Sequence, residues 1–207
     1  MMITVQAPAS KSVSHRMVMG AALAQGDSVV SRLLASQDLE RTMAILRGAG
    51  AGIVRTGEGE YAISGVGGQP HGGSVDPLSC DVHESGTTCR LLTAVLAAGM
   101  GRFRVHGAPR MHERPIGELT AALETLGVSF TFEGKPGFPP FVLKTCGLDG
   151  GEVGIGMDES SQYLSGVLLA APLARAPLTI NIGGSKVVSW PYVGLTLQAL
   201  ENFGVPF

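Results

Sequence analysis

The feature that most constrains the fold is an internal repeat. Three segments, GAALAQGDSVV, TAVLAAGMGRFRV and GVLLAAPLARAPLTI, each read as the apolar end of a helix followed by a strand. Leu23, Leu96 and Leu169 align within them at two equal steps, since 96 − 23 = 73 and 169 − 96 = 73. Such self-similarity is typical of a chain built from repeated structural units.

Glycines that close helices provide a second landmark. Gly50, Gly127 and Gly204 each end a helical pattern before a strand, and they too lie at equal steps, 127 − 50 = 77 and 204 − 127 = 77. Two independent landmarks with nearly the same period predict three related units in one domain over residues 1–207. The units cover approximately residues 10–79, 80–155 and 156–207.

The periodicities within a unit change in a fixed order. In the first unit, residues 15–24 read as a buried helix, DSVVSRL as a strand and DLERTMAILRGAG as an amphipathic helix. GIVRT and EYAISGV then form a hairpin-like pair. The second unit repeats the order, but the third ends at Phe207, where its last strand pair would begin. We therefore expect an α/β (α+β) fold of βαβαββ units with pseudo-threefold symmetry and an incomplete third unit.

Charge and cysteine usage exclude several classes of protein. A net charge of −2 with 15% charged residues provides no broad basic surface for nucleic acid or membrane, so anion recognition must be local. The three cysteines lack C-x-x-C spacing, and the five histidines lack H-E-x-x-H spacing, which argues against a disulfide framework or a metal site. The longest apolar runs are too short to span a bilayer, and the first residues lack a signal-peptide pattern. We expect a cytoplasmic protein without a metal site.

The repeat predicts where an anion would bind. Ser14, Thr87 and Ser160 each precede an aligned leucine by nine residues, and all three are good N-cap types. Pseudo-threefold symmetry would gather these helix starts at one end of the domain, with their free N–H groups and positive dipole ends. The alternative is that each residue simply caps its helix.

Cationic and hydroxyl side chains cluster around the expected helix starts. Lys11 and Arg16 flank the first, Gly86 and Arg90 lie in ESGTTCR at the second, and ESSQY marks the third. Arg114 stands before Pro115, a plausible first helical residue, and SWPYVGL repeats that arrangement in the third unit. Such groups suit a ligand that carries phosphate and carboxylate.

Five motifs then resemble, in order, the amino-terminal half of the 5-enolpyruvylshikimate-3-phosphate synthase family: PASKSVSHR, SGTTCRLLTAVLA, RMHERPIGEL, SSQYLSGVLLAAPL and VSWPYVGLTLQALENFGV. The resemblance covers nearly the whole chain. It implies transfer of the enolpyruvyl group of phosphoenolpyruvate to the 5-hydroxyl of shikimate 3-phosphate, a step in chorismate and aromatic amino-acid biosynthesis. Phosphate would leave through a tetrahedral intermediate, without metal or organic cofactor. It also implies two domains with helices inside and sheets outside, of which the second is absent here.

The resemblance assigns roles residue by residue. Lys11 would be catalytic and would contact both substrates. Shikimate 3-phosphate would be bound by Lys11, Ser12, Arg16, Ser160, Ser161, Gln162, Ser189 and Tyr192. Phosphoenolpyruvate would be bound by Lys11, Gly86, Arg114 and Gln162. We expect the complete protein to be a monomer, and the chain alone to be inactive or to bind shikimate 3-phosphate weakly. Two isolated chains could pair to cover an exposed sheet edge.

Several residues depart from the family pattern. His15 and Glu84 stand where Asn is usual, and Gln37 replaces the first acid of an S-D-D sequence. Glu84 would oppose anion binding unless it is paired, for example with Arg90 or Lys11. Cys89 replaces Met, and its apolar surroundings predict a packed core thiol.

Three alternatives stay open at this point. One is a non-catalytic anion-binding module with the same fold. Another is UDP-N-acetylglucosamine enolpyruvyl transferase, against which KS and SSQY argue. The third is a purely structural repeat domain, for which substitution of Lys11 or Arg114 would leave ligand affinity unchanged.

Overall fold

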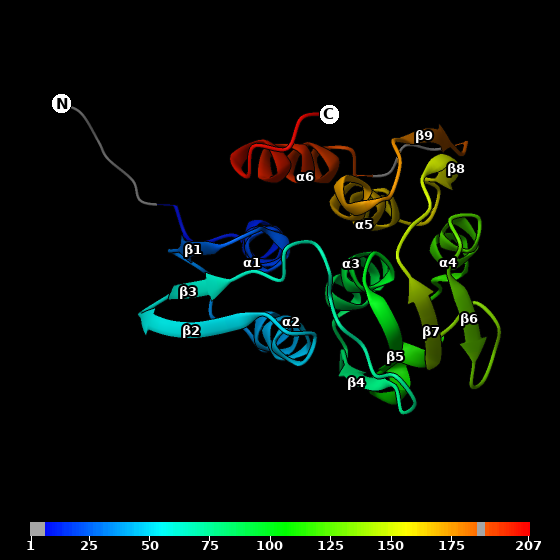
Figure 1. Ribbon diagram of the computed structural model, residues 1–207, viewed down its shortest axis with the longest axis horizontal. Helices are drawn as coiled ribbons and strands as arrows, with labels where there is room; N and C mark the ends of the chain where they lie inside the picture. The colour runs from blue at the N-terminus through cyan, green and yellow to red at the C-terminus, as the bar shows by residue number, and fades with distance from the viewer. Residues whose placement is uncertain (1–6, 186–188) are drawn as a thin grey trace.

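The computed structural model describes residues 7–185 and 189–207 as three small sheets that surround a group of helices (Figure 1). The predicted α/β class is confirmed. The first residue of the VSWPYVGL motif lies outside the described residues.

The first unit forms a three-stranded antiparallel sheet and two helices. Its elements are α1 (Lys11–Leu23), β1 (Asp27–Val30), α2 (Gln37–Gly48), β2 (Gly52–Gly57) and β3 (Glu60–Ser64). The sheet order is β1-β3-β2, with β3 antiparallel to both neighbours. The hairpin expected from GIVRT and EYAISGV is therefore present.

The second unit shows the full βαβαββ order. Its elements are β4 (Leu78–Asp81), α3 (Gly86–Ala97), β5 (Met100–His106), a 3-10 helix (Pro109–Glu113), α4 (Gly117–Glu124), β6 (Ser129–Phe132) and β7 (Phe141–Cys146). The sheet order is β4-β5-β7-β6. The segment β5-β7-β6 repeats the order of the first sheet, and β4 adds a parallel strand beside β5.

The third unit contains two parallel strands and two helices. Its elements are β8 (Gly151–Gly156), α5 (Ser161–Ala170), a 3-10 helix (Ala171–Leu173), β9 (Leu178–Gly183) and α6 (Pro191–Asn202). The parallel pair β8-β9 corresponds to β4-β5 of the second unit. The positions of β7 and β6 have no counterpart among the described residues of this unit.

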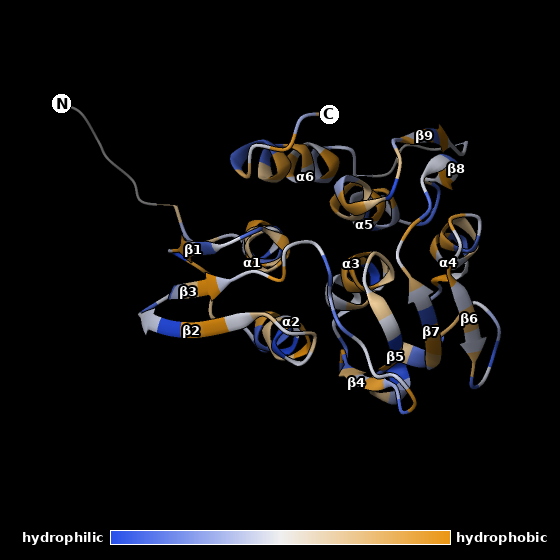
Figure 2. Ribbon diagram, viewed as in Figure 1, coloured by the Kyte–Doolittle hydropathy of each residue, from blue (hydrophilic) through white to orange (hydrophobic). Residues whose placement is uncertain are grey.

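The hydrophobic core lies where α1, α3 and α5 meet the inner faces of the sheets. Leu91, Leu96 and Tyr163 are almost completely buried there. In Figure 2, α5 is mostly orange, whereas α2 carries a blue polar face, as expected for a central and a peripheral helix respectively. The three central helices are thus mostly buried, and their exposed residues are Lys11 and Val13 in the first turn of α1.

The structure corrects the predicted N-caps. Ser10, Ser85 and Ser160 cap α1, α3 and α5, each through a side-chain oxygen that accepts a backbone N–H. These caps also lie at equal steps, 85 − 10 = 75 and 160 − 85 = 75. Ser14 and Thr87 lie inside their helices, so only the prediction for Ser160 was right. The helices have 13, 12 and 10 residues, and alignment at their apolar ends therefore misplaces the starts of the longer ones.

Three further details differ from expectation. Strands β4 and β8 were not predicted, because LSCD is short and GEVGIG is rich in glycine. Helix α4 begins at Gly117 rather than at Pro115, and Arg114 instead ends the preceding 3-10 helix. Across residues 7–185 and 189–207, no helix combines the length and apolar character needed to cross a bilayer.

Candidate functional site

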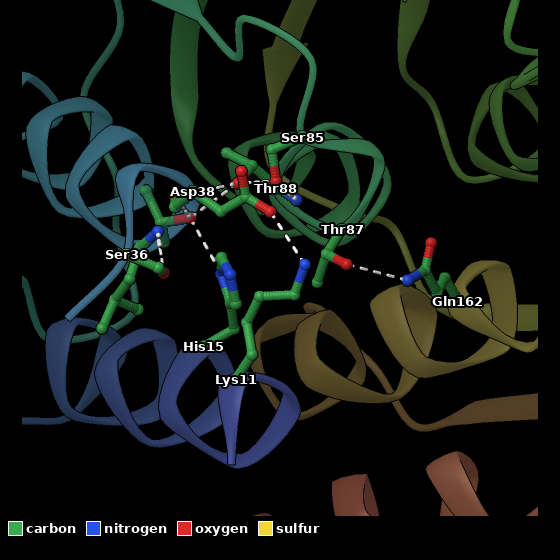
Figure 3. Close-up of polar contacts among 10 residues, drawn as sticks. Lys11, His15, Ser36, Asp38, Ser85, Thr87, Thr88 and Gln162 are labelled. Atoms are coloured by element: carbon green, nitrogen blue, oxygen red, sulfur yellow. Dashed lines mark hydrogen bonds and ion pairs between the residues drawn. The ribbon is translucent and has the colours of Figure 1, made fainter. Parts of the chain in front are cut away.

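The first turn of α3, residues Gly86, Thr87 and Thr88, is the meeting point of three groups of side chains; we call it the α3 turn. Figure 3 shows side chains of α1, α2, α3 and α5 pointing into the space around it. Ser85 caps the helix by accepting the Thr88 N–H at 3.2 Å. The start of α3 therefore brings unpaired N–H groups and a positive dipole end to the place where these elements converge.

Arg114 approaches the α3 turn at Gly86. A Cβ atom at Gly86 would lie 2.6 Å from Nη1 of Arg114, so this close approach requires glycine. The Arg114 side chain is half-buried and makes no hydrogen bond or ion pair within the described part of the chain. Its guanidinium group is therefore available to an anion.

Gln162 approaches the α3 turn at Thr87. Its Nε2 donates to Oγ1 of Thr87 at 3.0 Å (Figure 3). Its Oε1 accepts from Nη1 of Arg90 at 3.2 Å. Gln162 is the second residue of α5 and directly follows the buried pair Ser160 and Ser161. The start of α5 is therefore joined to the start of α3.

Lys11 approaches the α3 turn through Asp38. Its Nζ lies 2.9 Å from Oδ2 of Asp38, and the backbone carbonyl of Asp38 accepts from Oγ1 of Thr88 at 3.2 Å. Burial acts to raise the pKa of the Asp38 carboxyl, but the hydrogen bond and charge of Lys11 outweigh it and hold the pKa below its usual range. Asp38 is thus ionised and keeps the ammonium group beside α3.

A buried layer of polar groups lies behind the α3 turn. Nδ1 of His15 is 3.0 Å from Oγ1 of Thr42, which is 3.0 Å from Oγ1 of Thr88. Desolvation lowers the pKa of His15 to about 4, so the imidazole is neutral near pH 7. Its Nε2 atom is buried and has no hydrogen-bond partner within the described residues. His15 therefore has a structural role, in which it joins α1 to α2.

Arg16 is held differently from Lys11 and Arg114. It is 2% exposed, and Nε donates to Oγ1 of Thr196 at 2.7 Å. Nη1 donates to the Ser12 carbonyl, while Nη2 donates to Oγ of Ser165 and to the Tyr192 carbonyl. Burial lowers the pKa of Arg16 to about 10, still far above neutral pH. Four of its five N–H donors are therefore used within the chain, and three of them join α1 to α5 and α6.

The other candidate residues occupy the edges of this arrangement. Ser12 is half-buried on α1, whereas Ser189 and Tyr192 are exposed at the start of α6. Tyr192 meets Arg16 through its backbone carbonyl, and its side chain is 45% exposed. The structure thus brings Lys11, Gly86, Arg114 and Gln162 together at the α3 turn, whereas Tyr192 contacts Arg16.

Two predictions about neighbouring residues can be compared with the structure. Glu84 has neither suggested partner, because Lys11 pairs with Asp38 and Arg90 with Gln162; it is exposed beside the α3 turn. Cys89 is fully buried, and desolvation raises the pKa of its thiol to about 12, which confirms a packed core cysteine.

Sequence reasoning missed Asp38. The signal was present, since Asp38 lies in the first turn of α2, the second helix of its unit, and Arg114 and Ser189 had been chosen because they precede the second helices of theirs. Applied to the first unit, the same rule points to the start of α2, and Asp38 lies in its first turn.

The arrangement is suited to a ligand with several negative charges. Two cationic side chains and an amide lie around one helix start, whereas two hollows elsewhere are lined by none of the candidate residues. Within residues 7–185 and 189–207, no group of three or more His, Cys, Asp and Glu side chains could hold a metal ion. Side chains of these types can bind and orient anions.

Comparison with known proteins identifies the family. The model of the family described as EPSP synthase (3-phosphoshikimate 1-carboxyvinyltransferase) matches residues 2–207. The chain belongs to the EPSP synthase family. The 3-phosphoshikimate 1-carboxyvinyltransferases of Marinomonas sp. (strain MWYL1) and Nitrosomonas europaea are each 42% identical to it over 97% of its length. This membership disfavours the UDP-N-acetylglucosamine enolpyruvyl transferase alternative.

Solved EPSP synthase structures have the same fold. Two structures of EPSP synthase from Acinetobacter baumannii superimpose on 85% of the chain with a TM-score of 0.75 and 29% sequence identity. The chain covers 39% and 40% of those two proteins, and 47% and 46% of the Marinomonas and Nitrosomonas relatives. It thus spans about half the length of the curated EPSP synthases that it matches.

Proposed function

We propose that the chain is the amino-terminal domain of an enzyme that transfers the enolpyruvyl group of phosphoenolpyruvate to the 5-hydroxyl of shikimate 3-phosphate. The 5-hydroxyl oxygen forms a bond to C2 of phosphoenolpyruvate while the C2–C3 double bond takes up a proton at C3, which gives a tetrahedral intermediate. Loss of a proton from C3 and cleavage of the C2–O bond to phosphate then restore the double bond. The hydroxyl proton leaves with the base that accepts it, and inorganic phosphate is released. We call the longer polypeptide, with the second half that the relatives carry, the complete protein.

The observation that carries this proposal is the convergence at the α3 turn. Arg114 lies beside Gly86, Gln162 bonds to Thr87, and Lys11 reaches Thr88 through Asp38. The free guanidinium of Arg114 is matched to a carboxylate or phosphate, and the Lys11 ammonium supplies a point charge. Together they would stabilise the negative charge that develops as phosphate departs.

The remaining candidate residues would hold shikimate 3-phosphate. In this proposal Ser160, Ser161 and Gln162 bind its phosphate and ring at the start of α5. Arg16 and Ser12 hold its carboxylate, with Ser189 and Tyr192 lining the same side. Arg16 has one N–H donor beyond the four that it uses within the chain, so a carboxylate would compete for or add to its contacts.

The open face of the α3 turn supports a division into two halves. We propose that residues 1–207 form one domain of three units, near residues 10–79, 80–155 and 156–207, and that the missing half covers this face and supplies further acidic and basic groups. Closing the site would exclude water and strengthen each charge contact. The complete protein would act as a cytoplasmic monomer.

A turnover assay tests the proposal. Phosphate release is followed with phosphoenolpyruvate and shikimate 3-phosphate, for the complete protein and for the 207-residue chain at equal concentration. We expect turnover by the complete protein and none by the chain. Robust turnover by the chain alone would contradict the division of the site between two halves, and no turnover by either would contradict the activity itself.

Calorimetry distinguishes an enzyme from an anion-binding module with the same fold. The complete protein is titrated with shikimate 3-phosphate and with shikimate, and the titration is repeated for Lys11→Met and for a control, Lys135→Met, on the exposed loop between β6 and β7. Binding that requires the phosphate and weakens only in Lys11→Met is expected. Binding without turnover would identify a non-catalytic module, and unchanged affinity in Lys11→Met would favour a structural domain.

A further inference from the structure

One neighbour of Gln162 determines the orientation of its side-chain amide. A glutamine amide can turn by 180°, which exchanges a donor for an acceptor at the same place. Thr87 accepts from Nε2 at 3.0 Å, but a hydroxyl can donate as well as accept, so it tolerates either orientation. Arg90 cannot, because a guanidinium group has donors only.

We propose that Arg90 is a positioning residue that holds Gln162 with its N–H group, rather than its carbonyl oxygen, available to the anion at the α3 turn. Nη1 of Arg90 donates to Oε1 of Gln162 at 3.2 Å, which occupies the oxygen that would repel an anion. Nε2 has two N–H groups, and Thr87 uses one of them. The inference rests on the proposed function, in which Gln162 contacts both substrates.

Arg90 is itself fixed by two neighbours. Its Cζ lies 5.4 Å from the ring centroid of Tyr163, and its Nη2 lies 3.5 Å from the Pro115 carbonyl. The Tyr163 hydroxyl donates to the same carbonyl at 2.7 Å. The buried aromatic ring therefore supports the guanidinium plane. Because Pro115 follows Arg114, this contact also ties Gln162 to the segment that carries Arg114.

A direct role for Arg90 is the competing interpretation. Its Nη1 lies 3.8 Å from the place that a Cβ of Gly86 would occupy, so the charge is close enough to act on a ligand by itself. The two roles differ in one measurable way. A positioning residue acts through Gln162 and loses its effect when Gln162 is removed, whereas an independent cation does not.

A double-mutant cycle in the complete protein separates the two roles. The variants Arg90→Met, Gln162→Ala and the double variant are compared by their affinity for phosphoenolpyruvate in the presence of saturating shikimate 3-phosphate. Each single variant is expected to bind about tenfold more weakly, as for the loss of one hydrogen bond to a charged group. The double variant is expected to show the same tenfold loss.

Independent losses that multiply to about a hundredfold would overturn the inference. If Arg90→Met does not fold, the cycle is repeated with Arg90→Lys, for which we expect a loss of about threefold that again disappears in the Gln162→Ala background. Arg102→Met, on the exposed face of β5, is the matched control and should leave the affinity unchanged. Failure of the unmodified complete protein to bind phosphoenolpyruvate would instead overturn the proposed function and this inference with it.

Discussion

Two regions of the molecule contain basic side chains from the same short motifs but use them in opposite ways. At the α3 turn, Arg114 has no partner within the described residues, and the side chain of Lys11 is 47% exposed. Behind it, on the inner side of α1, Arg16 and His15 are almost completely buried. Arg16 makes four hydrogen bonds within the chain, and His15 is neutral and bonded to Thr42.

A basic residue in a motif therefore need not bind a ligand, because its burial and its partners decide its role. A cation that is buried and hydrogen-bonded contributes to the packing of helices, and its removal leaves polar partners without hydrogen bonds. A cation beside a helix start that is partly exposed, like Arg114 and Lys11, contributes little to folding and is accessible to an anion. Substitutions in the buried layer should therefore change stability, and substitutions at the α3 turn should change affinity.

The largest expected effect is on stability in the Arg16→Met variant. Loss of four hydrogen bonds, three of which join α1 to α5 and α6, should lower the free energy of unfolding by about 4 kcal/mol. Urea unfolding of the chain followed by circular dichroism measures this. Arg41→Met, which breaks an exposed ion pair with Asp81, is the control and should change it by less than about 1 kcal/mol. A small stability loss in Arg16→Met would contradict a structural role for Arg16, whatever the variant does to shikimate 3-phosphate binding.

The buried histidine should make stability depend on pH. The pKa of His15 is about 4 when folded and 6.5 in its ordinary state, so the unfolded chain binds more protons between these values. The free energy of unfolding should therefore be highest above pH 6.5 and fall by about 3 kcal/mol towards pH 4. Asp38, Lys11 and Arg16 are the charged groups that act on it. Urea unfolding measured across this pH range should show the decrease for the unmodified chain but not for His15→Asn. An equal decrease in the two proteins would assign it to other groups.

At the α3 turn, Arg114→Met should affect binding alone. We expect the affinity of the complete protein for phosphoenolpyruvate to fall about thirtyfold, or about 2 kcal/mol, with the free energy of unfolding changed by less than about 0.5 kcal/mol. Calorimetry and urea unfolding measure the two quantities. Arg110→Met, an exposed arginine of the preceding 3-10 helix, should leave both unchanged. A stability loss as large as that of Arg16→Met would remove the distinction between the two regions.

Gly86→Ala, which adds one methyl group, is the smallest change that tests the α3 turn. The added Cβ would lie 2.6 Å from Nη1 of Arg114 and would displace the guanidinium group, which is the end of a flexible side chain. Affinity for phosphoenolpyruvate should fall about tenfold, whereas stability should not fall, because alanine has the higher helix propensity. Affinity for shikimate 3-phosphate alone serves as the internal control. An equal loss for both ligands would show that the change spreads beyond Arg114.

The sequence was sufficient to predict the repeated order of helices and strands apart from β4 and β8, because glycine stops and apolar periodicity are local properties. It placed Lys11, Gly86, Arg114 and Gln162 near helix starts, where the structure has them. It could not predict that Arg16 points into the core, since its partners Thr196 and Ser165 are 180 and 149 residues away. Burial and pairing are decided by such distant contacts, so a motif alone could not separate the two kinds of cation.

The most direct test is a crystal structure of the complete protein with shikimate 3-phosphate and inorganic phosphate. Shikimate 3-phosphate is a substrate of the proposed reaction, and inorganic phosphate is a product. The account predicts that the inorganic phosphate lies at the α3 turn, in contact with Lys11, Arg114 and the Gln162 N–H group, while Arg16 keeps its bonds to Thr196 and Ser165. Phosphate bound away from the α3 turn, with Arg114 unoccupied, would contradict it.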